Sequence, residues 1–119
     1  MPKAKVKLRF LQKPTCTTCR TAKAFLERCG AELDSRDLGK ERLSAEEIDT
    51  LIGDRDYKAF LNTRNELYRA RKMAKNPPTR AESIQLMAGE PNLIRRPVVI
   101  RGRQIVFGYD EKALKEIAS

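Results

Sequence analysis

The stretch PTCTTCRTAKAFL, residues 14–26, places two cysteines at the start of a predicted helix. The apolar residues that follow Cys19 recur at helical spacing: Ala22, Phe25, Leu26 and Cys29. Gly30 marks the end of this helix, because glycine readily adopts the left-handed conformation found just after helices. The stretch therefore predicts a C-x-x-C pair, Cys16 and Cys19, at a helix N-terminus.

The segments on either side of this helix predict a small α/β fold. Before it, KVKLRFLQ (residues 5–12) alternates basic and apolar residues, as a strand with one buried face does. After it, AELDSRDL (residues 31–38) is a second, short strand, which a crossover helix would join in parallel to the first. Farther on, residues 96–110 contain two β-branched runs joined at Gly102, the pattern of a hairpin. Asp110 then caps a last helix whose inward face carries Leu114, Ile117 and Ala118. The sheet is therefore expected to be mixed.

The middle of the chain contains only helical patterns. Two capping boxes predict helix starts there: Ser44 with Glu47, and Thr79 with Glu82. Gly53 ends the first of these helices, and a further helix is expected from Arg64 to Lys75. We interpret residues 1–119 as a single domain with a helical insertion at approximately residues 44–90.

The composition combines a strong positive charge with a complete lack of histidine. The 119 residues carry a net charge of +9, and residues 60–119 hold 12 Lys and Arg against 6 Asp and Glu. This charge fits nucleic acid, an oxyanion or an acidic partner as well as a solvated surface. Without histidine no Ser-His or Cys-His pair can form, so any nucleophile must be activated in another way.

The start of the chain predicts no targeting segment. MPKAKVKLRFLQ has basic residues but neither a continuous apolar core nor a small-residue cleavage site. No apolar run approaches the about 18 residues that a membrane helix needs. We therefore expect a cytoplasmic protein with no membrane partner, in a compartment that keeps thiols reduced. The protein is also expected to be a monomer.

Three interpretations compete for the cysteine pair. A closed zinc site takes four ligands, usually Cys or His, and this chain has three Cys and no His, so no metal site is expected. A purely structural disulfide does not suit a reducing compartment. A redox pair fits best, because C-x-x-C follows a strand and opens a helix.

Position assigns different roles to the cysteines. Unpaired N–H groups and the helix dipole stabilise an anion at a helix start, so Cys16 is expected to be an exposed thiolate nucleophile. Cys19 lies one turn in, on the apolar face, and is expected to resolve the intermediate. Arg20 adds a positive charge beside the pair. Cys29 is about 15 Å from Cys19 by helix rise, too far for a disulfide, and is expected to be a buried spectator.

Four segments together resemble one known group. TCTTCRTAKAFL is similar to the opening motif of the arsenate reductase and Spx group, a glutaredoxin-like branch of the thioredoxin fold. LNTRNELYR resembles that group's Asn-Thr-Arg segment, NLIRRPVVI its Leu-Ile-Arg-Arg-Pro segment, and FGYDEKAL its closing Gly-Tyr or Gly-Phe segment. The segments occur in order over essentially the whole chain, so the resemblance implies a thioredoxin-like fold with an inserted helical subdomain.

The resemblance also implies a site. Cys16 matches the group's nucleophile, and Arg64 and Arg96 match two of the three arginines that hold the oxyanion. The Arg96–Pro97 peptide is expected to be cis and to face the Cys16 loop. The segment that would supply the third arginine reads FGYDEK and has none, which leaves Arg101 or Arg103 in the neighbouring hairpin as substitutes.

Two functions remain open at this point, with a third behind them. The first is an arsenate reductase-like thiol–disulfide oxidoreductase with no bound cofactor, acting on an oxyanion or disulfide and reduced by glutathione with glutaredoxin or by thioredoxin. The second is a redox-sensing transcription regulator of the Spx type that binds RNA polymerase. The third is direct nucleic-acid binding through RNELYRARKMAK, residues 64–75.

Overall fold

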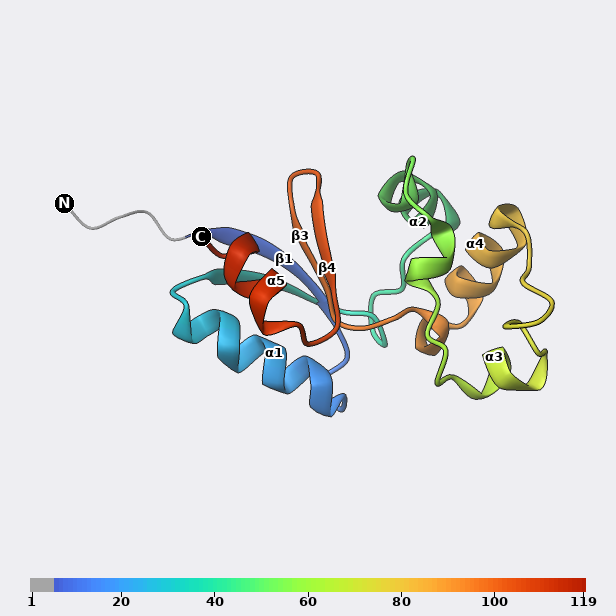
Figure 1. The fold of residues 1–119 in the computed structure, drawn as a ribbon, viewed down its shortest axis with the longest axis horizontal. Helices are drawn as coiled ribbons and strands as arrows, with labels where there is room; N and C mark the ends of the chain where they lie inside the picture. The colour runs from blue at the N-terminus through green and yellow to red at the C-terminus, as the bar shows by residue number, and fades with distance from the viewer. Residues whose placement is uncertain (1–5) are drawn as a thin grey trace. The chain divides into compact units, whose positions relative to one another are not determined.

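The computed structural model describes residues 6–119 as two compact units (Figure 1). The first unit combines the chain up to Leu38 with Arg96–Ser119, and the second unit is Gly39–Arg95. The first strand is predicted to start at Lys5, which lies outside the described residues. The first five residues, which belong to the segment that predicts a cytoplasmic location, lie outside them too.

The first unit is a four-stranded sheet with two helices. Its elements, in chain order, are β1 (Lys7–Gln12), α1 (Thr17–Arg28), β2 (Glu32–Asp37), β3 (Val98–Arg101), β4 (Gln104–Phe107) and α5 (Glu111–Ile117). The strand order is β2-β1-β3-β4, with β1 parallel to β2 and the other two pairs antiparallel. The predicted mixed sheet is confirmed, because the helix α1 makes the parallel crossover and the hairpin supplies the antiparallel edge.

Both helices of this unit pack against the same face of the sheet. The core cluster joins the alternate β1 residues Leu8 and Phe10 and their neighbour Val99 to Ala22 and Leu26 of α1 and to Leu114 and Ile117 of α5. Alternation along β1 places Leu8 and Phe10 on one face, as the sequence pattern predicts. The core therefore fixes α1, and with it the position of the cysteine pair, against the end of β1.

The second unit is helical. It contains α2 (Ala45–Ile52), the 3₁₀ turn η1 (Tyr57–Phe60), α3 (Glu66–Ala70), α4 (Arg80–Gly89) and the 3₁₀ turn η2 (Pro91–Leu93). The capping box at Ser44 is confirmed: Glu47 N–H donates to Ser44 Oγ at 3.1 Å, and Ser44 N–H donates to Glu47 Oε1 at 3.1 Å. Thr79 likewise caps α4 by accepting from Glu82 N–H at 3.1 Å. These local signals predicted both helix starts because they need only four consecutive residues.

The helix predicted from Arg64 to Lys75 is wrong in length. Asn65 caps α3, which ends at Ala70, and the chain then turns through Lys72 at φ +51°. Met73 N–H bonds the carbonyl of Tyr68 at 3.1 Å, and the Met73 side chain is 2% exposed. Burial of this side chain requires the chain to leave the helix, so tertiary packing overrides local helix propensity here.

Two further findings bear on function. Within residues 6–119 there is no helix long and apolar enough to cross a membrane. The same residues contain no group of three or more Cys, Asp or Glu side chains able to hold a metal ion.

Candidate active site

The site begins with Cys16, which is the N-cap of α1. Its backbone is extended (φ −84°, ψ 118°), and its own N–H donates to the carbonyl of Lys13 at 3.0 Å. Cys19 N–H donates to Cys16 Sγ at 3.3 Å, so the sulfur takes the place that a Ser or Asp oxygen occupies at other helix starts. The first turn of α1 contains no acidic residue, and the helix dipole therefore acts on the sulfur without opposition.

Cys16 is half-buried rather than exposed, and its thiolate is stabilised. Partial burial is the largest single influence and raises the pKa of Cys16. The hydrogen bonds from the Cys19 thiol and backbone, the charge of Arg96 and the backbone of Thr18 together outweigh it, so the pKa of Cys16 lies below its ordinary value of 9.0. The predicted thiolate thus has a physical basis in four nearby groups.

Cys19 has the opposite character. Its side chain is fully buried in the described structure, and burial is the main cause that raises the pKa of Cys19 to about 12. The backbone of Lys13 is the strongest opposing influence and lowers this pKa, as the charge of Arg96 does to a smaller extent. The hydrogen bond to Cys16 and the charge on the Cys16 thiolate raise it further. The structure records both cysteines as free thiols. One sulfur is therefore prepared to react while the other is held protonated.

Arg96 and Pro97 lie at the same end of the sheet as the cysteine loop. Val98 pairs with Leu11 in the antiparallel register, which places Pro97 beside the last residues of β1, just before that loop. The Arg96–Pro97 peptide is cis, as the resemblance implies, and the Pro97 carbonyl accepts from Gly108 N–H at 2.9 Å. The charge of Arg96 lowers the pKa of both cysteines. Arg96 is thus the cation that the structure brings to the pair.

The other two predicted substrate-binding arginines stay predictions. Arg20 lies exposed in the first turn of α1, where its backbone N–H bonds the carbonyl of Cys16 at 3.1 Å. Arg64 belongs to the second unit, where its N–H donates to Asn62 Oδ1 at 3.1 Å. Asn62 is fixed in turn by its own N–H to the carbonyl of Leu93 at 2.7 Å.

The hairpin arginines do not replace the missing third one. Ile100 pairs with Arg9 near the start of β1, so Arg101 lies about 10 Å along β3 from Val98, away from the cysteine loop. Arg101 Nη1 instead donates to the carbonyl oxygens of Ile117 and Ser119, at the end of α5. Arg103 lies beyond it in the turn of the hairpin.

The segment FGYDEK, where the resemblance implies a third arginine, makes an aromatic contact instead. Tyr109 packs edge-on against Phe25 of α1, with ring centroids 5.9 Å apart. Its hydroxyl donates to Glu111 Oε1 at 2.6 Å. This contact ties the start of α5 to α1, and it offers an oxyanion no cation.

The prediction for Cys29 is wrong, because this side chain is exposed. Cys29 is the C-cap of α1, and its N–H bonds the carbonyl of Phe25 at 3.1 Å. Ten residues at about 100° each place Cys29 about 80° around the helix from Cys19, off the buried face. Sequence reasoning also missed the backbone of Lys13, which contacts both cysteines; a backbone contact leaves no signal in residue type.

Comparison with known proteins adds the family to this geometry. The profile of the ArsC family matches residues 11–117. The chain belongs to the ArsC family. The match includes the cysteine loop, the cis peptide and both units, and it confirms the resemblance to the arsenate reductase and Spx group.

Relatives within this family have different assigned roles. The chain is 31% identical over 113 residues to the uncharacterized protein YusI of Bacillus subtilis, covering 92% of this chain and 96% of YusI. It is 26% identical over 104 residues to the global transcriptional regulator Spx of Lactiplantibacillus plantarum, covering 86% of this chain and 79% of Spx. A solved structure of a possible arsenate reductase from Streptococcus mutans superposes with a TM-score of 0.73 at 32% identity, over 86% of this chain and 90% of that one. Family membership alone therefore does not choose between reductase and regulator.

Proposed function

We propose that this protein is a cytoplasmic thiol–disulfide oxidoreductase of the arsenate reductase type, with Cys16 as nucleophile and Cys19 as resolving thiol. The observation that carries this proposal is the opposition of the two thiols: the pKa of Cys16 lies below its ordinary value, whereas burial holds that of Cys19 at about 12. Such a difference suits a pair in which one sulfur attacks the substrate and the other stays protonated until the second step.

The reaction with a disulfide substrate has two exchange steps. The Cys16 thiolate attacks one substrate sulfur, a new S–S bond forms, and the other substrate sulfur leaves as a thiolate that takes a proton from water. Cys19 then attacks the Cys16 sulfur and releases the second substrate thiol. The substrate gains two electrons, and the Cys16–Cys19 dithiol loses two.

The first exchange step removes one of the influences that raise the pKa of Cys19. Once Cys16 is bonded to substrate, it no longer carries the negative charge that raises the pKa of Cys19. Arg96, whose charge lowers that pKa, stays in place. The pKa of Cys19 therefore falls in the mixed-disulfide intermediate, which is when the thiolate is needed.

For arsenate, arginine side chains offset the charge repulsion between the thiolate and the substrate. Attack of a thiolate on an oxyanion brings two negative charges together, and arginine offsets this with a planar fork that binds two oxygens. We assign this role to Arg96, and we propose Arg64 and Arg20 as further substrate-binding arginines.

When the Cys16 sulfur bonds to arsenic, one As–O bond breaks and that oxygen leaves as water after taking up protons from solvent. Glutathione would then attack the Cys16 sulfur of this thiol–arsenate adduct, so that arsenic leaves as arsenite with the bonding electron pair and Cys16 becomes a mixed disulfide. Glutaredoxin or thioredoxin would then reduce this mixed disulfide and restore the Cys16 thiol. Alternatively, Cys19 would displace glutathione to form the Cys16–Cys19 disulfide, which glutaredoxin or thioredoxin would reduce to the two thiols.

The test is an NADPH-coupled arsenate reduction assay, run with glutathione plus glutaredoxin and separately with thioredoxin. The proposal expects turnover in the wild type and in Cys29→Ser, whose exposed thiol lies outside the pair, and none in Cys16→Ser. Turnover that survives in Cys16→Ser would contradict the proposal. If arsenate gives no turnover but a glutathione mixed disulfide does, the disulfide substrate is the physiological class and the roles of the cysteines stand.

A second candidate is a redox-responsive regulator, favoured by the match to Spx over 86% of this chain. Here the Cys16–Cys19 disulfide would switch binding to RNA polymerase rather than turn over a substrate. Pull-down of purified polymerase by the oxidised and the reduced protein decides it. Equal absence of binding in both states excludes the regulator.

A further inference from the structure

The second unit carries a concentration of positive charge that the proposed redox chemistry does not use. Arg69, Arg71, Lys72 and Lys75 follow one another in residues 69–75, and all four side chains are exposed. Within residues 6–119 none of the four forms an ion pair, whereas Arg80 nearby pairs with Asp49 at 2.5 Å and bonds its carbonyl at 3.3 Å. Adjacent like charges that no acid neutralises destabilise a folded surface slightly, and an anionic partner bound there would relieve that repulsion.

The fold holds these cations outward in a fixed turn. Lys72 N–H bonds the carbonyl of Arg69 at 3.1 Å, and Lys75 N–H bonds that of Lys72 at 3.1 Å. Met73 is 2% exposed and anchors the turn in the interior of the unit. The four cations are thus presented by a compact anchored segment, which we call the basic turn (residues 69–75).

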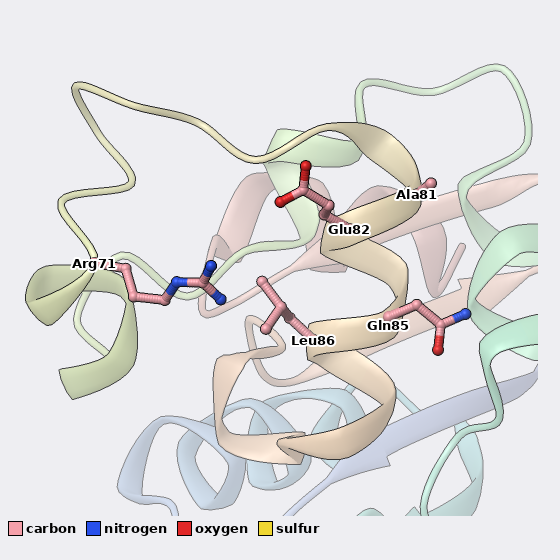
Figure 2. A pocket seen from close by; sticks show the side chains of 5 residues that line it. All are labelled: Arg71, Ala81, Glu82, Gln85 and Leu86. Carbon is pink, nitrogen blue, oxygen red and sulfur yellow. The ribbon is translucent and has the colours of Figure 1, made fainter.

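A pocket lies directly beside the basic turn. It has a volume of about 370 Å³ and is lined by Arg71, Ala81, Glu82, Gln85 and Leu86. Figure 2 shows the Arg71 guanidinium extending toward the side of α4 from which Leu86 and Glu82 project. Its walls are mainly apolar, and this size is at the small end of ligand-binding cavities. The pocket therefore suits one apolar group next to an acidic one.

We propose that the basic turn and this pocket together form a docking surface for an acidic peptide segment of a partner protein, one apolar side chain of which enters the pocket. The charge requires an extended anionic partner, because four separate cations exceed what a ligand small enough for the pocket can neutralise. The pocket supplies the anchor that gives such a contact its position.

Glu82 gives the surface a polarity. Its carboxylate stands on the rim of the pocket and accepts from Thr79 Oγ1 at 3.3 Å. A partner must therefore place its acids on the Arg71 side of the pocket and keep them away from the start of α4. A peptide can meet this requirement, since each of its charges belongs to an individual side chain whose position in the peptide sequence can vary.

A nucleic acid fits this surface less well. Its phosphates repeat uniformly and would meet Glu82 at the rim. Stacking of exposed bases needs aromatic platforms, and Tyr68, which is half-buried, is the only aromatic residue between Leu61 and Pro78. The acidic peptide is therefore the occupant that both the charges and the pocket favour.

The test measures binding of a fluorescent synthetic peptide in which a central leucine is flanked by glutamates, by fluorescence polarisation on the full chain. Arg71→Glu reverses one charge at the pocket, and Ala81→Phe fills the pocket while leaving every charge in place. Each variant is expected to weaken binding by about tenfold or more. Lys112→Glu, an equal charge reversal at an exposed site of α5 in the other unit, is the matched control and is expected to bind as the wild type does.

Two changes of probe complete the test. Replacing the leucine by glycine should weaken binding to the wild type, and a peptide with lysines in place of the glutamates should bind Arg71→Glu better than the wild type. Equal binding of the leucine and glycine peptides, tighter binding of a single-stranded oligonucleotide, no measurable peptide binding, or no effect of Arg71→Glu would each overturn the proposal. Peptide binding requires no redox chemistry, so Cys16→Ser, which tests the proposed function, leaves this result unchanged.

Discussion

The difference in pKa between the two thiols makes a quantitative prediction about alkylation of the reduced protein. With a pKa of about 12 against an ordinary 9.0, Cys19 forms about a thousandfold fewer thiolates at neutral pH than an unperturbed thiol. A thiolate of higher pKa is intrinsically more nucleophilic, and a difference of three pH units raises its intrinsic reaction rate about 20-fold. Cys16 has a pKa below 9.0, so at neutral pH it should react at least about 50-fold faster than Cys19, before burial of Cys19 adds to the difference.

The assay is a time course of iodoacetamide labelling of Cys29→Ser, which removes the exposed third thiol. No Lys or Arg lies between Cys16 and Cys19, so trypsin leaves both cysteines in one peptide and fragment ions must locate the label. The pH dependence of labelling should give Cys16 an apparent pKa below 9.0. Comparable labelling rates at the two sulfurs, or a Cys16 pKa at or above 9.0, would refute the electrostatic account of the site.

Further predictions concern stability and are all measured by urea unfolding of the reduced protein. The hydroxyl of Ser83 is fully buried with no hydrogen-bond partner within the described residues, so Ser83→Ala should raise the free energy of unfolding by about 1 kcal/mol; a loss would contradict this. Arg101→Leu should lower it by about 1–3 kcal/mol, because Arg101 bonds carbonyls at the end of α5; an unchanged value would show that these bonds contribute nothing. Because folding raises the pKa of Cys19, protonated Cys19 contributes fully to the free energy of unfolding below pH 9. This contribution is lost as the pH rises toward 12, by about 1.4 kcal/mol per pH unit. Cys19→Ala should therefore show a flatter alkaline decline, and an identical slope would refute the assignment.

Features that depend on a few neighbouring residues could be predicted from the sequence. The caps at Ser44, Thr79 and Asp110 and the hairpin at Gly102 are local patterns, and the structure has all of them. The cysteine pair at the start of α1 is another. Each of these needs only backbone hydrogen-bonding rules and side-chain type.

Features that depend on contacts between distant residues could not be predicted from the sequence. The helix expected up to Lys75 ends early because Met73 is buried elsewhere in the unit. Cys29 seemed to share a face with Cys19, but the accumulated helical rotation carries it to the surface. The difference between the two thiols comes mainly from burial of Cys19 and from hydrogen bonds within the cysteine loop. Arg96, which lowers the pKa of both thiols, lies 77 residues beyond Cys19 in sequence and reaches the pair only through the strand register.

The most direct test of the redox pair is to react the reduced Cys29→Ser protein, which lacks the exposed third thiol, with glutathione disulfide and to weigh the products by intact mass spectrometry. In this background one glutathione is expected on Cys16 when Cys19→Ser is added and no adduct at residue 19 when Cys16→Ser is added. With both Cys16 and Cys19 present, an intramolecular disulfide without glutathione is expected. Glutathione attached to Cys19 in Cys16→Ser as readily as to Cys16 in Cys19→Ser would contradict the assignment of nucleophile and resolving thiol.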